Sequence, residues 1–289
     1  MKTLFFSLIL LITAHSVSAQ SLNESIEKET FLYAVKDTQK LYFDKYRLSS
    51  DDKIQPVLVF MFGGGFRRGE RDNPGFLTYF HFLAENGFTV ISIDYRLGMN
   101  SVMRSGENLN KAITLAVEDL YDATAFIVEN ASEWKVNPAL IVINGSSAGG
   151  ITALQGLYEL NTGGSLAQKL PEDFNYAGAI AFSGAILTTS EMQWRSPVPP
   201  VMLFHGDQDD LVPYDHFSMS GFGLYGSNHI AAKLDSVNAP YWFITFNNEA
   251  HKITGSPRSK YRQEILKFLK DMVIKQENMT VRTQVKLIK

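Results

Sequence analysis

Ala139-Leu-Ile-Val-Ile-Asn-Gly-Ser-Ser-Ala-Gly-Gly-Ile-Thr-Ala153 is the stretch of sequence that decides the fold. It begins with an apolar, β-branched run at 140–143, which predicts a buried strand, and it ends with 148–160, which predicts a helix. Between them lies the pattern Gly-x-Ser-x-Gly at 145–149. A strand before this pattern and a helix after it are the context that makes it a candidate nucleophile turn.

The spelling of this turn has a steric reason. A strand that reverses directly into a helix forces its corner residue into a sparsely populated backbone region. Glycine stands two positions before and after the corner, where a side chain would collide with neighbouring backbone. The corner residue then lies above the N–H groups of the helix N-terminus. We therefore predict Ser147 as a nucleophile and Ser146 as its flank, against the alternative of a plain glycine-rich turn.

Strand-like and helix-like segments alternate along the rest of the chain. We expect strands at 31–36, 41–48, 56–62, 88–94, 176–182, 201–205 and 241–246, and helices at 73–86, 108–130, 226–236 and 260–273. Such alternation predicts an α/β fold with a mostly parallel, doubly wound sheet flanked by helices on both faces. The binding site of such a sheet lies at its carboxyl edge.

The first residues have the pattern of a targeting segment. Lys2 precedes an apolar run at 4–13, and Val17-Ser-Ala19 has the small residues of a cleavage site, so we expect 1–19 to be a signal peptide. The apolar run is shorter than the roughly twenty residues that span a bilayer, so no stable membrane insertion is expected. The chain has no cysteine. Export without disulfides favours the bacterial periplasm or the extracellular space.

Residues 20–289 are expected to form a single domain, because no linker or repeat divides them. The net charge of −3 and the lack of a basic cluster argue against a nucleic-acid partner. The last residues, 274–289, include a stretch in which apolar and polar side chains alternate. This end of the chain is either an extra strand or a solvated basic tail, and the oligomeric state is left open.

Three further loops follow predicted strands. The first is Phe62-Gly-Gly-Gly-Phe66, whose glycines allow backbone N–H groups to approach a ligand oxygen closely. With the N–H of Ala148 they could hold the negative oxygen of a tetrahedral intermediate. The alternatives are a plain turn or a phosphate-binding loop, although the Lys-Ser/Thr ending of a Walker loop is missing.

The second loop, 205–213, has three aspartates, Asp207, Asp209 and Asp210. One of these carboxylates could orient a histidine ring, but the residues alone do not say which. Turn formation or a small cation site are the alternatives.

The third loop, 247–251, ends in His251, a base of the type that titrates near neutral pH. His216 is its one serious rival, whereas His205 is expected to be a structural hydrogen-bonding residue. The order serine, acid, histidine is the one expected for a nucleophile elbow on this sheet.

Together these motifs resemble those of the α/β-hydrolase superfamily, of the carboxylesterase and lipase-like type, near its hormone-sensitive-lipase-like and exported carbohydrate-esterase branches. The resemblance covers about 31–273 and includes Asp94-Tyr-Arg-Leu97. It implies the α/β-hydrolase fold, Asp209 as the acid, and oxyanion amides at Gly64, Gly65 and Ala148. It also implies that the segment 94–97 is scaffold.

Two departures from the pattern of these relatives stand out. Phe62 occupies the place where many relatives have histidine, and aromatic replacements there occur in carboxylesterases. The Ala-Pro-Glu continuation after 94–97 is missing, and 98–104 reads Gly-Met-Asn-Ser-Val-Met-Arg instead. The second departure weakens assignment to the hormone-sensitive-lipase-like branch itself.

The resemblance implies a serine hydrolase that forms an acyl-enzyme on short-chain acyl esters and needs no metal or cofactor. Acetylated polysaccharide is one substrate that we consider, and Phe66, Arg67 and Tyr79 are expected to line the substrate site. An amide-cleaving enzyme with the same triad, arylformamidase-like or a small peptidase, is the alternative. A non-catalytic binding protein on this fold is a second alternative, although such a protein is expected to have lost a triad residue.

Overall fold

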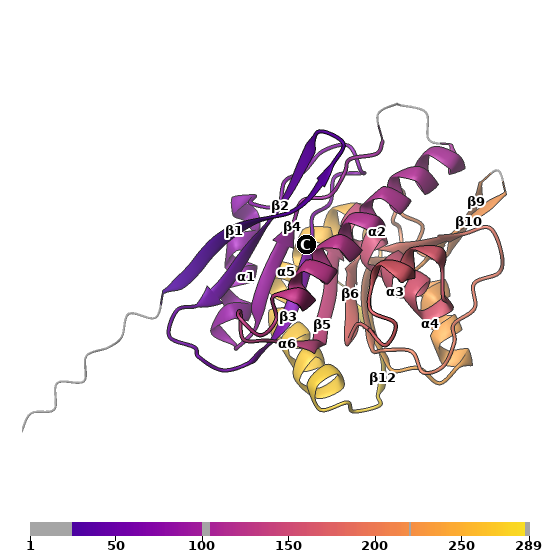
Figure 1. Cartoon of the computed structure of the whole chain (residues 1–289). Coiled ribbons are helices and arrows are strands. Elements are labelled where there is room, and N and C mark those ends of the chain that lie inside the picture. The colour runs from indigo at the N-terminus through magenta and orange to yellow at the C-terminus, as the bar shows by residue number, and fades with distance from the viewer. Residues whose placement is uncertain (1–24, 100–104, 220, 287–289) are drawn as a thin grey trace, which may run out of the picture.

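A computed structural model of the chain describes residues 25–99, 105–219 and 221–286. The expected signal peptide, 1–19, lies outside these residues. The largest element is a nine-stranded sheet with the order β1-β2-β4-β3-β5-β6-β8-β11-β12, shown in Figure 1. Its strands are β1 (Ile26–Lys36), β2 (Gln39–Leu48), β3 (Gln55–Met61), β4 (Thr89–Ile93), β5 (Val136–Ser146), β6 (Gly178–Phe182), β8 (Val201–Gly206), β11 (Tyr241–Phe246) and β12 (Thr280–Val285).

The sheet is mostly parallel. β1 and β2 form an antiparallel hairpin, and β2 pairs antiparallel with β4. Every other neighbouring pair in the sheet order is parallel. The predicted fold class is therefore confirmed.

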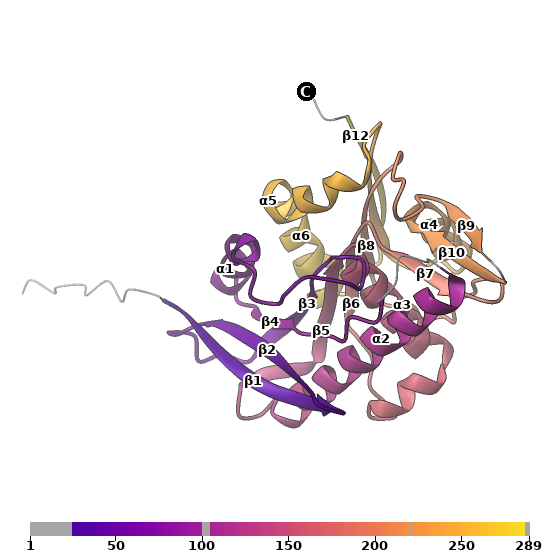
Figure 2. The ribbon, with the colours of Figure 1, turned by 90° about the horizontal axis from the view of Figure 1, so that it is seen from above.

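The helices lie on both faces of the sheet. They are α1 (Leu77–Glu85), α2 (Gly106–Glu129), α3 (Ala148–Thr162), α4 (Ser227–Ser236), α5 (Ser256–Lys260) and α6 (Arg262–Phe268), with short 3₁₀ turns at Pro74–Phe76, Ser165–Lys169 and His251–Gly255 and a π-helical turn at Leu269–Ile274. Figure 2 shows α2 and α3 on one side of the sheet and α1, α5 and α6 on the other. The single helix predicted at 260–273 is in fact divided between α5, α6 and the π-helical turn.

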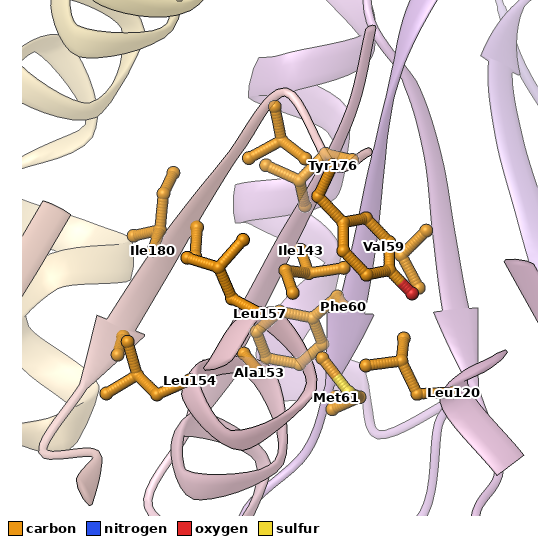
Figure 3. Close-up of a cluster of buried hydrophobic side chains, with 14 of the residues drawn as sticks. Val59, Phe60, Met61, Leu120, Ile143, Ala153, Leu154, Leu157, Tyr176 and Ile180 are labelled. Carbon is orange, nitrogen blue, oxygen red and sulfur yellow. The ribbon is translucent and has the colours of Figure 1, made fainter. Parts of the chain in front are cut away.

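The core fills the space between the sheet and these helices. Strand side chains such as Val59 and Ile143 meet Leu120 from α2 and Leu157 from α3 (Figure 3), and these four are buried. Burying each such side chain contributes about 1.5–3 kcal/mol of hydrophobic stabilisation. The apolar character of the central strands on both faces thus follows from their place between two helical layers.

Both ends of the sheet extend beyond the predicted strands. β1 begins at Ile26, before the strand predicted at 31–36, in a polar part of the sequence. The polar residues pair across the hairpin, as Lys28 does with Asp44 at 2.9 Å. At the other edge, 280–285 forms β12, parallel to β11, so of the two alternatives for 274–289 the extra strand is the one that forms.

A second, three-stranded sheet with the order β7-β10-β9 was not expected from the sequence. Its antiparallel strands are β7 (Ala185–Thr188), β9 (His216–Met219) and β10 (Phe222–Gly226). They are too short to give a clear period-2 pattern. Across the described ranges, no helix is both long and apolar enough to cross a membrane.

The strand register brings the four predicted site loops to one edge. Met61 of β3 pairs with Gly145 of β5, and Phe246 of β11 pairs with Gly206 of β8. Because these strands are parallel, the loops that follow them leave the sheet at the same level.

Candidate active site

The turn between β5 and α3 has the strained geometry that the sequence predicts. Ser147 has φ 54° and ψ −117°, a conformation that a residue with a side chain rarely adopts. Its N–H donates to the carbonyl oxygen of Phe182 at 2.7 Å, and its carbonyl oxygen accepts from the N–H of Ile151 at 2.8 Å. These bonds hold the strained corner in place at the start of α3.

Close backbone approach explains both flanking glycines. A Cβ at Gly145 would lie 2.1 Å from the carbonyl oxygen of Gly149, and a Cβ at Gly149 would lie 2.1 Å from that of Met61. Both distances are far below van der Waals contact. The Gly-x-Ser-x-Gly spelling is therefore imposed by packing.

His251 reaches the serine from the loop after β11. Its Nε2 lies 2.8 Å from the Ser147 Oγ. Its Nδ1 lies 2.8 Å and 3.0 Å from the two carboxylate oxygens of Asp209. With the proton on Nδ1, the ring donates to Asp209 and accepts the hydroxyl hydrogen of Ser147 at Nε2.

The three aspartates of the 205–213 loop lie in different places. The side chain of Asp209 is fully shielded from solvent and is the one that contacts His251. Asp207 accepts a hydrogen bond from the N–H of Asn248 at 2.7 Å, which ties the acid loop to the histidine loop. Asp210 is exposed. The structure thus separates three residues that the sequence alone leaves equivalent.

Asp209 is held in its ionised form. Burial raises the pKa of its carboxyl group, but hydrogen bonds from His205 and His251 and from the N–H of Val212 outweigh burial and lower the pKa. The His205 Nε2 lies 3.3 Å from the carboxylate, and its Nδ1 lies 2.8 Å from the Ser227 Oγ. His205 is therefore a hydrogen-bonding residue behind the acid.

The predicted oxyanion amides lie beside the serine. Gly64 and Gly65 have φ values of +134° and +65°, and both line the cavity that contains Ser147 and Ala148. A Cβ at Gly64 would lie 1.9 Å from the carbonyl oxygen of Arg68, so only glycine fits there. Ala148 is the first residue of α3, where N–H groups have no intrahelical partner.

The segment 94–97 supports the glycine loop from behind. The Tyr95 hydroxyl donates to the carbonyl oxygen of Phe62 at 2.7 Å, and the two rings stack with centroids 4.4 Å apart. Arg96 donates to the fully buried Asp119, with its Nε 2.9 Å from Oδ1. Phe62, at the position where many relatives have histidine, is therefore a buried scaffold residue that stacks on Tyr95.

The cavity above the serine has a volume of about 1250 Å³. Phe66 and Arg67, two of the three residues expected to contact substrate, line it. Tyr79 does not, and the expectation for this residue is wrong. Its side chain is 1% exposed, and its hydroxyl donates to the Asn144 Oδ1 at 3.0 Å, because this face of α1 packs on the sheet.

His216, the rival base, lines the cavity but contacts neither Ser147 nor Asp209 by hydrogen bond; its Nδ1 lies 3.4 Å from a carboxylate oxygen of Asp215. Among the described residues, Asp215, His216 and His229 are a group that could hold a metal ion, with one ligand atom of each within 4.8 Å of the others. Hydrolysis by the serine does not require this group.

Arg258 is a cavity residue that the sequence reasoning missed. It lies on α5, seven positions after His251, and lines the same cavity. The only signal in the sequence is its nearness to the predicted base, because a single arginine in a polar segment has no distinguishing pattern.

Comparison with known proteins agrees with this fold. The BD-FAE family model matches residues 43–192, about half of the 289-residue sequence. No curated protein matches the chain in sequence.

Similar solved structures come from an esterase of the Planctomycetes species Thermogutta terrifontis. Its propionate-bound form is 20% identical, with a TM-score of 0.63 and coverage of 87% of this chain and 95% of that chain. Its form phosphorylated by paraoxon is 21% identical, with the same TM-score and coverage. At this sequence identity the structural similarity shows the fold, and the match to the family model shows the family. The chain belongs to the BD-FAE family, a family of the α/β-hydrolase type.

Proposed function

We propose that the chain is a serine carboxylic-ester hydrolase that acts through an acyl-enzyme on short-chain acyl esters. The observation that supports this most is the continuous hydrogen-bonded series from Ser147 to His251 to the shielded Asp209. It lies at a cavity open to a small molecule. A nucleophile, a base and an orienting acid in this geometry are the requirements for acyl transfer.

In the first step, His251 accepts the proton of the Ser147 hydroxyl as the oxygen attacks the ester carbonyl. Asp209 keeps the ring in the required tautomer and stabilises the imidazolium that forms. The N–H groups of Gly64, Gly65 and Ala148 donate to the oxyanion, and one such donor typically contributes about 3–4 kcal/mol of transition-state stabilisation. His251 then gives its proton to the departing alcohol.

In the second step, water takes the place of the alcohol. His251 accepts a proton from the water as it attacks the acyl-enzyme, and the same amides stabilise the second oxyanion. The acid product leaves, and the proton returns to the Ser147 oxygen. Besides substrate and water, every group named in this cycle is a side chain or backbone group of this chain.

The proposal of a short acyl group has support from the comparisons. The Thermogutta terrifontis esterase has been solved with propionate and with butyrate bound. The acetyl groups of acetylated polysaccharide are of this size. They fit a protein that we propose is exported by its first 19 residues to the periplasm or the extracellular space.

Labelling by a fluorophosphonate tests the nucleophile. The wild-type protein should label, and Ser147→Ala should not, with turnover lower by about 10⁶-fold if the triad acts as a unit. Ser146→Ala is the matched control, because it removes the neighbouring hydroxyl and should still label. Labelling that is lost in Ser146→Ala but kept in Ser147→Ala would refute the assignment.

Acetyl and butyryl esters compared with aminoacyl amides test the bond that is cleaved. We expect the esters to be hydrolysed and the amides to be poor substrates. Turnover of the amides alone would replace the esterase proposal with a peptidase or amidase.

A further inference from the structure

Arg258 is a partly buried cation with no anionic partner in the part of the chain that the structure describes. Its guanidinium lies over the ring of Phe76, with the central carbon 4.7 Å from the ring centroid. Its Nε is buried without a hydrogen-bond partner. Across residues 25–99, 105–219 and 221–286, no ion pair or hydrogen bond engages this side chain.

Two other partly buried arginines of the described chain, Arg71 and Arg96, are paired with carboxylates. Arg71 contacts Asp94 at 2.8 Å, and Arg96 contacts Asp119 and Glu118, each at 2.7 Å.

Arg47 has no carboxylate partner within the described ranges but donates to backbone carbonyl oxygens, and Arg262, which stacks on Phe82, does not line the cavity. Arg258 differs from all of these, since it lines the cavity of Ser147 and has no carboxylate partner among the described residues.

Stacking on Phe76 does not satisfy Arg258. A ring contact uses the flat face of the guanidinium, whereas its five N–H donors lie in the plane of the group. Burial lowers the pKa of Arg258, with the nearby Tyr79 acting weakly in the opposite direction. This shift reflects the cost of holding the charge away from water, a cost that a bound anion would offset.

Arg258 lies where a substrate in the active-site cavity can supply such an anion. The residue lines the same cavity as Ser147 and His251. Arg67 and Arg68 line this cavity too, and both are exposed. Of the cavity's acidic side chains, Asp209 is engaged by the histidines, which leaves the exposed Asp210.

We infer that Arg258 binds a carboxylate carried by the ester substrate, so that the preferred substrates are anionic esters. This inference rests on the proposed esterase function and names its substrate class. The in-plane N–H groups of a guanidinium match the two oxygens of a carboxylate. The carboxylate belongs either to the acyl part or to the alcohol part of the ester, and a matched pair of substrates tests each case.

The first pair places the charge on the acyl part: monoethyl succinate against ethyl succinamate. The second places it on the alcohol part: 4-acetoxybenzoate against 4-acetoxybenzamide. Each pair exchanges a carboxylate for a neutral amide of the same shape. We expect the wild-type protein to prefer the carboxylate in one pair by about 10- to 100-fold in kcat/KM, the range for a hydrogen bond to a charged group.

Arg258→Gln should abolish this preference, mainly by raising KM for the ester that carries the carboxylate. For the esters that carry a neutral amide, kcat/KM should change by less than about threefold. Arg258→Lys should retain part of the preference, because it keeps the charge but not the fork. Arg195→Gln is the matched control for a lost positive charge. Its backbone bonds to Asn161, fourteen residues along α3 from Ser147, or about 20 Å.

The inference is overturned if the wild type shows no preference in either pair, or if Arg258→Gln lowers both members of a pair equally. If the wild-type protein hydrolyses none of these esters, the proposed esterase function is refuted instead. If the wild type hydrolyses no ester, or if Arg258→Gln does not fold, the carboxylate site is tested directly by binding. The experiment is calorimetric titration of the wild type and Arg258→Lys with succinate and succinamide. Equal binding of the two compounds to the wild type would refute it.

Discussion

Asp209→Asn separates the charge of the acid from its shape. One carboxylate oxygen of Asp209 accepts from the N–H groups of Leu211 and Val212 at 3.0 and 2.9 Å, and an amide oxygen can keep both bonds. The amide NH₂ then replaces the oxygen that lies 2.8 Å from the His251 Nδ1. Two donors cannot face each other, and the remaining oxygen, 3.0 Å from Nδ1, already accepts from the two loop N–H groups. We therefore expect the ring to move its proton to Nε2.

That tautomer has no lone pair for the Ser147 proton. In serine hydrolases with this triad, the equivalent change lowers kcat by about 10⁴-fold, or about 5.5 kcal/mol of transition-state stabilisation. We expect a loss of this size in the steady-state hydrolysis of 4-nitrophenyl acetate at pH 7. The fold should survive, because the two loop N–H groups keep their acceptor.

The matched controls are Asp207→Asn and Asp210→Asn. The first retains an acceptor for the Asn248 N–H, and the second changes an exposed side chain, so each should alter kcat by less than about threefold. A kcat above one tenth of wild type in Asp209→Asn, or a large loss in Asp210→Asn, would refute the assigned acid.

The same substitution predicts a change in acid stability. Hydrogen bonds lower the pKa of Asp209 in the folded state despite its burial. The carboxylate therefore contributes stability above its unfolded pKa of about 3.9, and this contribution is lost as the pH falls toward the folded pKa. The difference in free energy of unfolding between wild type and Asp209→Asn should begin to shrink below about pH 4 and continue to shrink as the pH falls further. A constant difference from pH 7 to pH 3 would contradict this account.

Two substitution sets test the scaffold by chemical denaturation. Gly149→Ala should prevent folding or abolish activity, because its Cβ would meet the carbonyl oxygen of Met61 at 2.1 Å. Gly156→Ala on the same helix should change stability by about 1 kcal/mol or less, since its Cβ would meet side-chain atoms, the Leu120 Cδ2 at 2.9 Å and the Tyr121 Cε1 at 3.6 Å. Asp119→Ala should lower the free energy of unfolding by about 3–5 kcal/mol, because it leaves Arg96 without its buried partner; a loss below about 1 kcal/mol would show that the pair is not structural.

The sequence predicted the sheet because buried parallel strands have a strong signal. The runs at 140–143 and 201–204 are continuous and apolar, and they lie between helical layers where no alternation is needed. The elbow was equally readable, since only glycine fits at 145 and 149. In such places the local sequence is set by local sterics, and a short window contains the whole reason for its residues.

The sequence was a weaker guide to residues whose role depends on contacts with distant parts of the chain. Tyr79 is an aromatic residue near the site loops, but it faces Asn144 of β5, and the choice of helix face depends on that partner. The hairpin residues before Phe31 are polar because β1 is a partly exposed edge strand whose charges pair with β2. Arg258 gave no pattern, because its significance is the absence of a carboxylate that only the folded structure reveals.

The strained serine explains why the site depends on packing from three strands. A corner residue in this conformation costs about 1–3 kcal/mol, and α3 and β6 hold it through bonds to Ile151 and Phe182. Gly149 seats the helix against the carbonyl oxygen of Met61 at the end of β3, where the glycine loop of the oxyanion site begins. A shift of α3 would therefore move Ser147 and the Ala148 N–H relative to Gly64 and Gly65, so substitutions that loosen this helix should lower kcat before they unfold the protein.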